Sequence, residues 1–142
     1  MKIAPVRDVD ERLVADLARL LPQLSPDRAP PTRDELEALV AQSGVELLAA
    51  TDDDRTLGML TLVVYRIPSG VKARIESVVV DEGARGKGVG EALTRDALER
   101  AVAAGARRVE LTSRPMREAA NRLYPRLGFE RLETNVYVWR AG

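Results

Sequence analysis

The feature that most constrains the fold is a change of residue pattern within residues 74–104. Residues 74–80, RIESVVV, are rich in β-branched and apolar side chains, which is typical of a buried strand. From Val89 onward, apolar residues recur at the spacing of a helix. The segment between them, residues 81–90, reads DEGARGKGVG and contains four glycines. The pattern therefore predicts a buried strand, a glycine-rich turn and a helix, in that order.

The turn at residues 81–90 has the properties of an anion-binding site. The first N–H groups of a helix have no partner within the helix, and they lie at the positive end of the helix dipole. Glycines leave these amides open to a phosphate and permit the dihedral angles at which successive N–H groups converge. Arg85 and Lys87 add full positive charges. The alternative interpretation is an ordinary strand-to-helix connection with solvated charges.

Two common phosphate-binding motifs do not match this turn. A nucleoside-triphosphate loop requires Ser or Thr after its lysine to hold a metal ion, whereas Gly88 follows Lys87. The dinucleotide fingerprint requires G-x-G-x-x-G, whereas Gly86, Gly88 and Gly90 form G-x-G-x-G. We therefore exclude both motifs.

Composition limits the chemistry that is available to the chain. Its 142 residues fit one domain with a single core. Lys plus Arg equals Asp plus Glu at 22 each, so no net charge favours nucleic acid or a membrane surface as a partner. The chain has no cysteine and no histidine, which excludes disulfides, cysteine nucleophiles and thiolate or imidazole metal ligands. Proton transfer must then use carboxylates, tyrosines, lysines or water, and we expect no metal.

The N-terminal residues, MKIAPVRDVDERL, carry charges throughout and do not resemble a signal peptide. No apolar run approaches the ~20 residues of a membrane helix. We therefore expect a cytoplasmic protein without a membrane segment.

Capping boxes, glycines and prolines divide the rest of the chain into elements. Capping boxes at Asp8/Glu11 and Thr32/Glu35 predict two helices, the first of which should end at Pro22. The other predicted helices are residues 88–104 and 117–127, and the predicted strands are residues 1–7, 45–51, 56–66, 74–80, 107–113, 129–132 and 135–140. This order, β-α-α-β-β-β-α-β-α-β-β, predicts an α/β (α+β) fold with a mixed, mostly antiparallel central sheet of about seven strands and four flanking helices.

Two further expectations concern packing. Gly58 lies inside a predicted strand, which indicates a bulge or the close approach of another backbone. We assign Phe129, Tyr137 and Trp139 to the core because large aromatic side chains favour burial.

Residues 85–90 spell R-x-x-G-x-G, between a strand that ends VVVD and a helix that continues EAL. This pattern resembles the coenzyme A signature of the GNAT superfamily of N-acetyltransferases, and the predicted order of elements is also that of the family. In the family, the turn amides hold the pyrophosphate of acetyl-coenzyme A and the preceding strand pairs with its pantetheine arm. The resemblance implies pantetheine contacts at Val78, Val79 and Val80, and pyrophosphate contacts at Arg85, Gly86, Lys87, Gly88, Val89 and Gly90.

A second motif strengthens the resemblance. Asn121 and Tyr124, followed by Leu-Gly-Phe at residues 127–129, look like the family's N-x-x-Y...L-G-F pattern. The resemblance implies that Asn121 contacts the cofactor, and that Tyr124 lies near the thioester sulfur as a cofactor contact and general acid. Tyr124 as a packing residue is the alternative. Pro125 departs from the pattern, because a proline at this position removes a helical hydrogen bond and disfavours helical dihedrals at Tyr124.

Acetyl transfer also requires a base, because an ammonium of pKa ~10.4 must lose its proton before the nitrogen can attack. Glu76 and Glu110 are the candidates, and each lies in an otherwise apolar predicted strand. We favour Glu76, although pairing with Arg74, Arg66 or Arg114 would equally explain its presence. Glu110 is more readily explained as a structural residue, and water could serve as the base in place of either.

The resemblance implies one N-acetyltransferase domain over residues 1–142. Its function would be the acetyl-coenzyme A-dependent transfer of an acetyl group to a primary amine of a small molecule or protein, by direct attack on the thioester. The alternative is a catalytically inactive acyl-coenzyme A sensor or interaction domain with the same fold. The final strand, if exposed, would offer an edge for a homodimer.

Overall fold

The computed structural model describes residues 1–142, which divide into two compact units, residues 1–112 (unit 1) and 113–142 (unit 2). Unit 1 contains β1 (Lys2–Pro5), α1 (Glu11–Leu24), α2 (Arg33–Ala41), β2 (Val45–Asp52), β3 (Arg55–Ile67), β4 (Gly70–Val80), the 3-10 turn η1 (Glu82–Ala84), α3 (Val89–Ala103) and β5 (Val109–Glu110). Unit 2 contains α4 (Glu118–Arg126). The assignment of residues 1–142 to a single domain stays a prediction.

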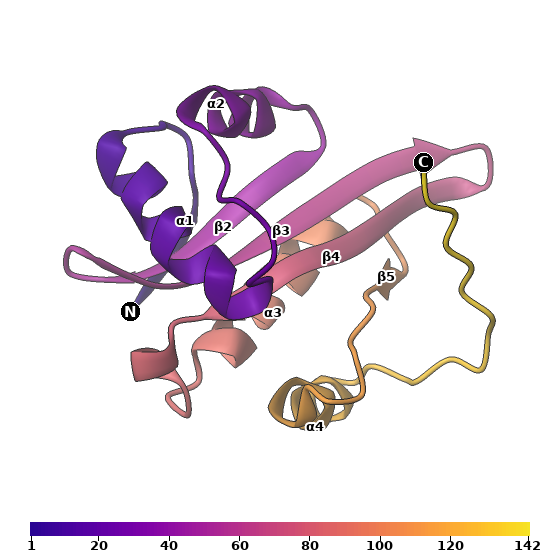
Figure 1. The fold of residues 1–142 in the computed structure, drawn as a ribbon. Coiled ribbons are helices and arrows are strands. Elements are labelled where there is room, and N and C mark those ends of the chain that lie inside the picture. The colour runs from indigo at the N-terminus through magenta and orange to yellow at the C-terminus, as the bar shows by residue number, and fades with distance from the viewer. The chain divides into compact units, whose positions relative to one another are not determined.

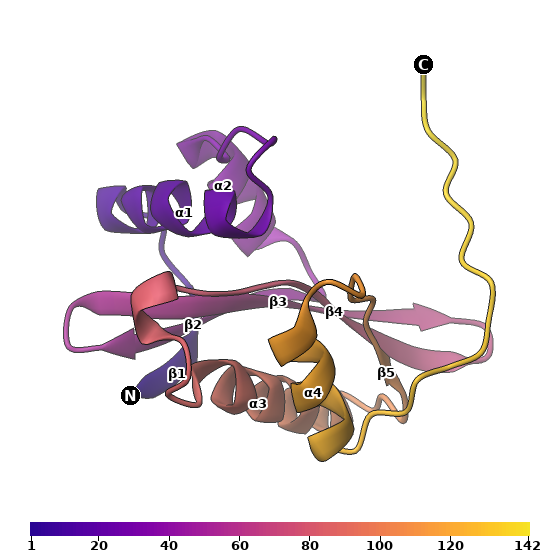
Figure 2. The same cartoon turned by 60° about the horizontal axis from the view of Figure 1, so that its bottom comes forward.

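The sheet of unit 1 has five strands in the order β1-β2-β3-β4-β5. Neighbours from β1 to β4 are antiparallel, and β5 runs parallel to β4 after the crossover through α3. Helices α1 and α2 lie on one face of this sheet and α3 lies on the other (Figures 1 and 2). The predicted fold class, with a mixed, mostly antiparallel sheet and four helices, is therefore confirmed.

The predicted number of strands, about seven, is wrong: the sheet has five. Residues 129–132 and 135–140 form no strand. Tyr137 and Trp139 are 87% and 86% exposed, so their assignment to the core is also wrong. An alternating apolar pattern forms a strand only where a neighbour supplies backbone partners and a face to bury, and the sheet offers none to these residues. Phe129 is half-buried and contacts the Tyr124 ring edge-on, with 5.5 Å between centroids.

The first two helices begin with side-chain caps. The cap of α1 is Asp10 rather than Asp8, and its Oδ1 accepts a hydrogen bond from the Leu13 N–H at 2.8 Å. The capping box of α2 is as predicted, because the Thr32 hydroxyl accepts from the Glu35 N–H and the Glu35 carboxylate accepts from the Thr32 N–H.

The prediction that α1 ends at Pro22 is wrong. The helix continues to Leu24, with Pro22 in its last turn. Proline removes the hydrogen bond to the carbonyl four residues earlier, and its ring crowds that carbonyl. The Ser25 N–H still closes the helix by donating to the Leu21 carbonyl at 2.8 Å. The loss of one bond so near the end of a helix is tolerated.

The core of unit 1 lies on both faces of the sheet. Under α1 and α2, a buried cluster contains Leu13, Leu17, Leu20, Leu36, Leu47, Met59 and Val79. Both β4 and α3 approach Gly58 closely. A Cβ there would lie 2.8 Å from the backbone carbonyl oxygen of Val79 in β4 and 3.1 Å from Cγ1 of Val89 in α3, on the other face of the sheet. The register of β2 and β3 also shifts beside Gly58. Both predicted reasons for this glycine are therefore confirmed, and they let α3 pack against the end of β4.

Candidate functional site

Strand β4 contains a bulge that the sequence did not reveal. Between the register pairs Thr61–Glu76 and Met59–Val79, β4 has two residues and β3 has one. Ser77, in the bulge, has φ = +52°, in the left-handed region that residues other than glycine rarely adopt. Such a conformation costs about 1 kcal/mol or more, and it is typically held by the structure around it. Residues 74–80, RIESVVV, contain no glycine or proline that would signal this irregularity.

Strand β4 pairs with β3 along one side. On its other side, beyond the start of the strand, it has no strand partner in unit 1. Strand β5 pairs with β4 only at Ala73–Val109 and Arg74–Glu110, so the prediction of a strand over residues 107–113 was too long. Residues 75–80 therefore have β3 on one side and no sheet partner on the other. An open edge of this kind can accept an extended ligand as an additional strand.

The glycine-rich turn connects this open edge to α3. Gly86 and Gly88 have φ angles of +77° and +81°, and no atom lies within 4 Å of a Cβ built at either position. Gly88 is the N-cap of α3, and no side chain caps the helix. The N–H groups of the first turn are thus available to an anion, and Arg85 and Lys87 are exposed beside them. The geometry fits the phosphate-binding interpretation of the turn.

The carboxylate of Asp81 is buried where β4 enters the turn, and three side chains bind it. Arg19 of α1 forms an ion pair with it, Arg55 Nη2 lies 3.0 Å from Oδ2, and Gln23 Nε2 lies 3.1 Å from Oδ1. Gln23 also accepts a hydrogen bond from the Glu82 N–H at 2.8 Å. We call this group the Asp81 clamp. It attaches the first residues of the turn to α1 and to the start of β3, and sequence reasoning missed it because its members lie far apart in the chain.

The electrostatics of the Asp81 clamp favour the ionised carboxylate. Burial disfavours the charge, but the hydrogen bonds from Arg55 and Gln23 and the charges of Arg19 and Arg55 outweigh it and lower the pKa of Asp81 below its usual value. A carboxyl group whose pKa is lower in the folded state stabilises the fold above its unfolded pKa, ~3.9, and loses this effect as the pH falls through the folded value.

The two candidate bases lie in different surroundings. Glu76 is exposed on β4, and its Oε1 accepts a hydrogen bond from Arg74 Nε at 3.1 Å. Glu110 of β5 is half-buried, with Arg108 Nε at 3.4 Å and Lys72 Nζ at 3.9 Å from its Oε2. Glu110 thus has two cationic partners, whereas the carboxylate of Glu76 has one and adjoins the bulge.

Unit 2 holds the second motif. Asn121 Nδ2 donates to the Arg114 carbonyl at 2.9 Å, and α4 continues through Pro125 to Arg126. Tyr124 is buried, and burial raises its pKa above the usual value despite the opposing charge of Arg117. The phenol is therefore protonated at neutral pH.

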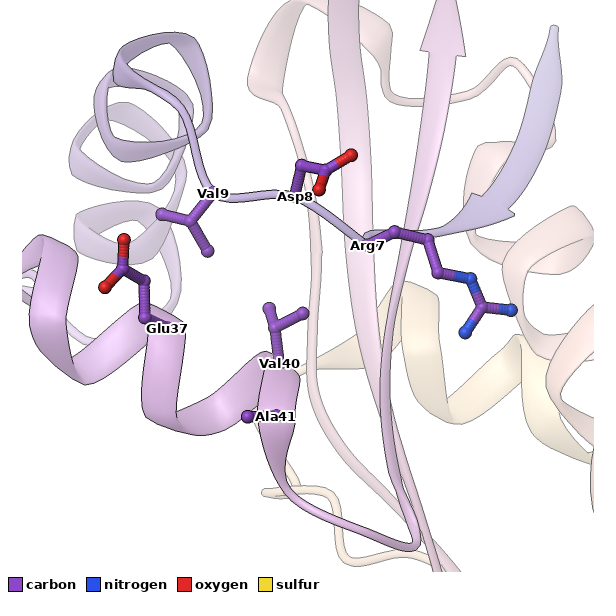
Figure 3. A pocket seen from close by; sticks show the side chains of 6 residues that line it. All are labelled: Arg7, Asp8, Val9, Glu37, Val40 and Ala41. Atoms are coloured by element: carbon purple, nitrogen blue, oxygen red, sulfur yellow. The ribbon is translucent and has the colours of Figure 1, made fainter.

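Two cavities lie in unit 1. One, of about 120 Å³, lies between α1, α2 and the sheet, and Thr61, Ser77 and Val79 are among the residues that line it. The other, of about 350 Å³, lies between residues 7–9 and α2 (Figure 3). In Figure 3, Val9 and Val40 point into the second cavity and Arg7 points away from it. The first cavity adjoins the β4 bulge, and none of the sequence-predicted site residues lines the second.

No helix of the structure combines the length and the apolar character needed to cross a bilayer.

Several solved structures share the fold of the chain. An acetyltransferase from Trypanosoma brucei is 26% identical, with a TM-score of 0.79, and the match covers 98% of this chain and 99% of that one. A transcriptional regulator from Bacillus halodurans C-125 is 27% identical, with a TM-score of 0.79 and the same coverage. An aminoglycoside acetyltransferase from an uncultured soil metagenomic sample, in complex with sisomicin, is 19% identical, with a TM-score of 0.85 over 99% of this chain and 95% of that one.

These similarities identify the fold as that of acetyltransferases. Residues 11–129 match the acetyltransferase (GNAT) family, and the chain belongs to this family. A search of curated proteins found no match. The resemblance drawn from the two motifs is therefore confirmed at the level of the family, which supports acetyl transfer in general.

The Asp81 clamp leads to a prediction about stability. We expect Asp81→Asn to lower the free energy of unfolding at pH 7 by about 1 to 3 kcal/mol, because the variant loses charged hydrogen bonds in a buried place. The difference from wild type should begin to shrink as the pH falls below ~3.9, where Asp81 of the unfolded chain takes up a proton, and should go on shrinking as the pH falls through the lower pKa of the folded state. Urea unfolding at pH 7 and at decreasing pH would measure it.

Asp54→Asn is the matched control, because the Asp54 side chain is fully exposed and pairs only at the surface with Arg12. We expect a change within about 0.5 kcal/mol for this variant. An Asp81→Asn effect that stayed constant from pH 7 to pH 3 would contradict a stabilising role for the ionised carboxylate.

Proposed function

We propose that the chain is an acetyl-coenzyme A-dependent N-acetyltransferase, which transfers an acetyl group to a primary amine of a small molecule or a protein. The observation that carries this proposal is the direct passage from the open edge of β4 into the uncapped, glycine-rich start of α3. A ligand in which phosphate groups follow an extended arm matches both features, in the order in which they occur along the chain. Acetyl-coenzyme A is such a ligand, and membership of the family supports it.

In this proposal, the pantetheine arm lies along β4 and its amides exchange hydrogen bonds with the backbone of Val78, Val79 and Val80. The pyrophosphate binds the N–H groups of residues 86–90, where the helix dipole favours an anion. Arg85 and Lys87 supply charge to the phosphates. Asn121 is proposed as a further contact of the arm, from its motif.

The reaction forms a bond between the amine nitrogen and the thioester carbonyl carbon, and it breaks the bond between that carbon and sulfur. We propose Glu76 as the base that accepts the proton of the ammonium, directly or through water. A bulge leaves a backbone N–H without a ladder partner, and such a donor at the β4 bulge is suited to stabilise the oxyanion. Glu110 is proposed as a structural residue, because two cations already pair with it.

The leaving thiolate, of pKa ~8.5 as for a cysteine thiol, then takes up a proton. We propose Tyr124 as the donor. The Tyr124 phenol is protonated at neutral pH, as a general acid requires, although the burial that raises its pKa makes it a weaker acid. The nitrogen of the new amide gives up its second proton to solvent. After product release Glu76 also loses its proton to solvent and Tyr124 takes one up, so one proton is released for each acetyl group transferred.

A second function, a sensor or interaction domain without turnover, is favoured by one observation. The 27% identical relative from Bacillus halodurans is described as a transcriptional regulator. Thiol release distinguishes the two functions, because a sensor would bind acetyl-coenzyme A without releasing coenzyme A in the presence of any amine.

The phosphate contacts give a first test. We expect Lys87→Ala to weaken acetyl-coenzyme A binding by about 12-fold to 150-fold, the effect of losing one hydrogen bond to a charged group. Adding salt should reduce the difference, because the Lys87 side chain is exposed to solvent. Isothermal titration calorimetry would measure both effects. Lys2→Ala, at the exposed first residue of β1, is the matched control and should bind like wild type. Equal affinity for both variants would contradict the proposed position of the phosphates.

The choice between the two carboxylates gives a second test. Glu76→Gln should lower kcat by about 100-fold at pH 7, at the low end of the usual contribution of a general base. The loss should shrink as the pH approaches the pKa of the acceptor, because the amine then loses its proton without help. Thiol-release rates from pH 6 to pH 10 would show this profile. Glu110→Gln should keep at least half of the wild-type kcat, and the reverse ranking of the two variants would assign the base to Glu110.

A further inference from the structure

The cavity of about 120 Å³ beside the β4 bulge connects the core to the surface of unit 1. Its inner wall includes Met59 and Val79, which are 1% and 4% exposed, and its outer part includes Ser77, which is exposed. Helices α1 and α2, which cover one face of the sheet (Figure 2), both contribute residues to its lining, so the cavity lies on that face. Leu21 of α1 and Leu39 of α2, both half-buried, line it from above the sheet. A ligand could therefore enter at the bulge and reach buried apolar side chains.

The lining of this cavity selects for apolar groups. Apart from the hydroxyl groups of Thr61 and Ser77, only aliphatic side chains, Met59 and one proline line it, and no charged side chain does so. A charged group placed there would lose its hydration without gaining a partner, whereas an aliphatic group would gain from leaving water. A cavity of 150 Å³ with a similar lining holds a benzene molecule, so this one has room for roughly four to five carbon atoms.

The position of Glu76 connects this cavity to the reaction. Thr61 lines the cavity, and Glu76 is its register partner on β4, so both side chains lie on the same face of the sheet. Directly opposite residues of an antiparallel pair have Cβ atoms about 5 Å apart. Ser77, the next residue, also lines the cavity. An amine held at the Glu76 carboxylate would thus have the mouth of an aliphatic cavity within the reach of one side chain.

We propose that this cavity binds an aliphatic side chain of the acceptor. This side chain is attached to the same carbon atom as the amine. The acceptor is then the α-amine of an apolar amino acid or of a peptide chain that begins with one. This inference rests on the proposed function. An α-amine, of pKa ~7.7 to 8.0, has a neutral fraction of roughly one in ten to one in six at pH 7, against fewer than about one in a thousand for an amine of pKa ~10.4, so a partly solvated carboxylate is sufficient as the base.

Binding can be tested without turnover by NMR of 13C-labelled methionine methyl groups. The chain has three methionines; Met59 lines the cavity, and Met1 and Met116 are 58% and 76% exposed and serve as internal references. In the presence of coenzyme A, leucinamide should shift the Met59 signal, whereas glycinamide should not. Leucinamide and a Leu-Ala-Ala peptide amide distinguish a free amino acid from a peptide N-terminus as the source of the group.

Turnover gives the second readout. We expect kcat/KM for leucinamide to exceed that for glycinamide by about tenfold to 200-fold, the usual discrimination of an apolar pocket. Leu39→Phe should fill the cavity and abolish both this preference and the Met59 shift. Val40→Phe is the matched control, because the neighbouring residue of α2 lines the other cavity (Figure 3). Should Leu39→Phe fail to fold, Leu21→Phe fills the same cavity from α1.

The outcomes separate the two proposals. Thiol release from both amines at equal rates, with an unmoved Met59 signal, overturns this inference and leaves the proposed function standing. A Met59 shift with leucinamide, but no thiol release from any amine, overturns the proposed function and supports an apolar ligand at this place. If neither a Met59 shift nor thiol release is observed, both proposals are overturned.

Discussion

The fold around the site depends on one buried charge. Asp81 directly follows β4, and its carboxylate binds Arg19, Gln23 and Arg55 from two other elements. Its own N–H also donates to the Leu57 carbonyl at 2.7 Å. A glycine-rich turn has many accessible conformations, so its ordering costs conformational entropy that few contacts within the turn can offset. By attaching the first residues of the turn to α1 and β3, the clamp provides contacts from outside the turn and holds its amides at the start of α3.

Three properties of β4 follow one another along the strand. At its start, β4 pairs with strands on both sides; at the bulge, its register against β3 changes; and at its end, it enters the turn. Each change serves a different part of the proposed reaction. In the proposed mechanism, the open edge accepts an extended ligand, the bulge presents Glu76 and Ser77 to the face under α1 and α2, and the turn binds phosphate. A regular strand with a partner on each side would leave no place for the ligand.

The sequence predicted what depends on local chemistry. The glycines of the turn, the capping box at Thr32 and the close approach at Gly58 all follow from preferences of single residues, and the structure has each of them. Sequence-based prediction failed where contacts between residues far apart in the chain determine the structure. The Asp81 clamp joins residues that lie up to 62 positions apart, and the bulge at Ser77 breaks a run that looks regular.

The prediction for the C-terminal residues was wrong because the partners that a strand needs are absent. Their alternating apolar pattern fits a strand, but no strand of the sheet pairs with residues 129–140, and Trp139 stays exposed. The length of β5 is also set by its neighbour rather than by its own residues, because it remains a strand only where it pairs with β4. For the site, the residue types and the turn were predictable, whereas the cavity next to Glu76 required the packing of two helices against three strands.

The central claim is that backbone amides of the turn and of the β4 edge bind the cofactor. Amide NMR spectra recorded during a titration with coenzyme A test it most directly, because they report on the N–H groups themselves. We expect the largest shifts at Gly86, Gly88 and Gly90, with a second set at Val78, Val79 and Val80. Unchanged signals at these six residues at millimolar coenzyme A, or the largest shifts beside the other cavity at Arg7 and Ala41, would contradict the account.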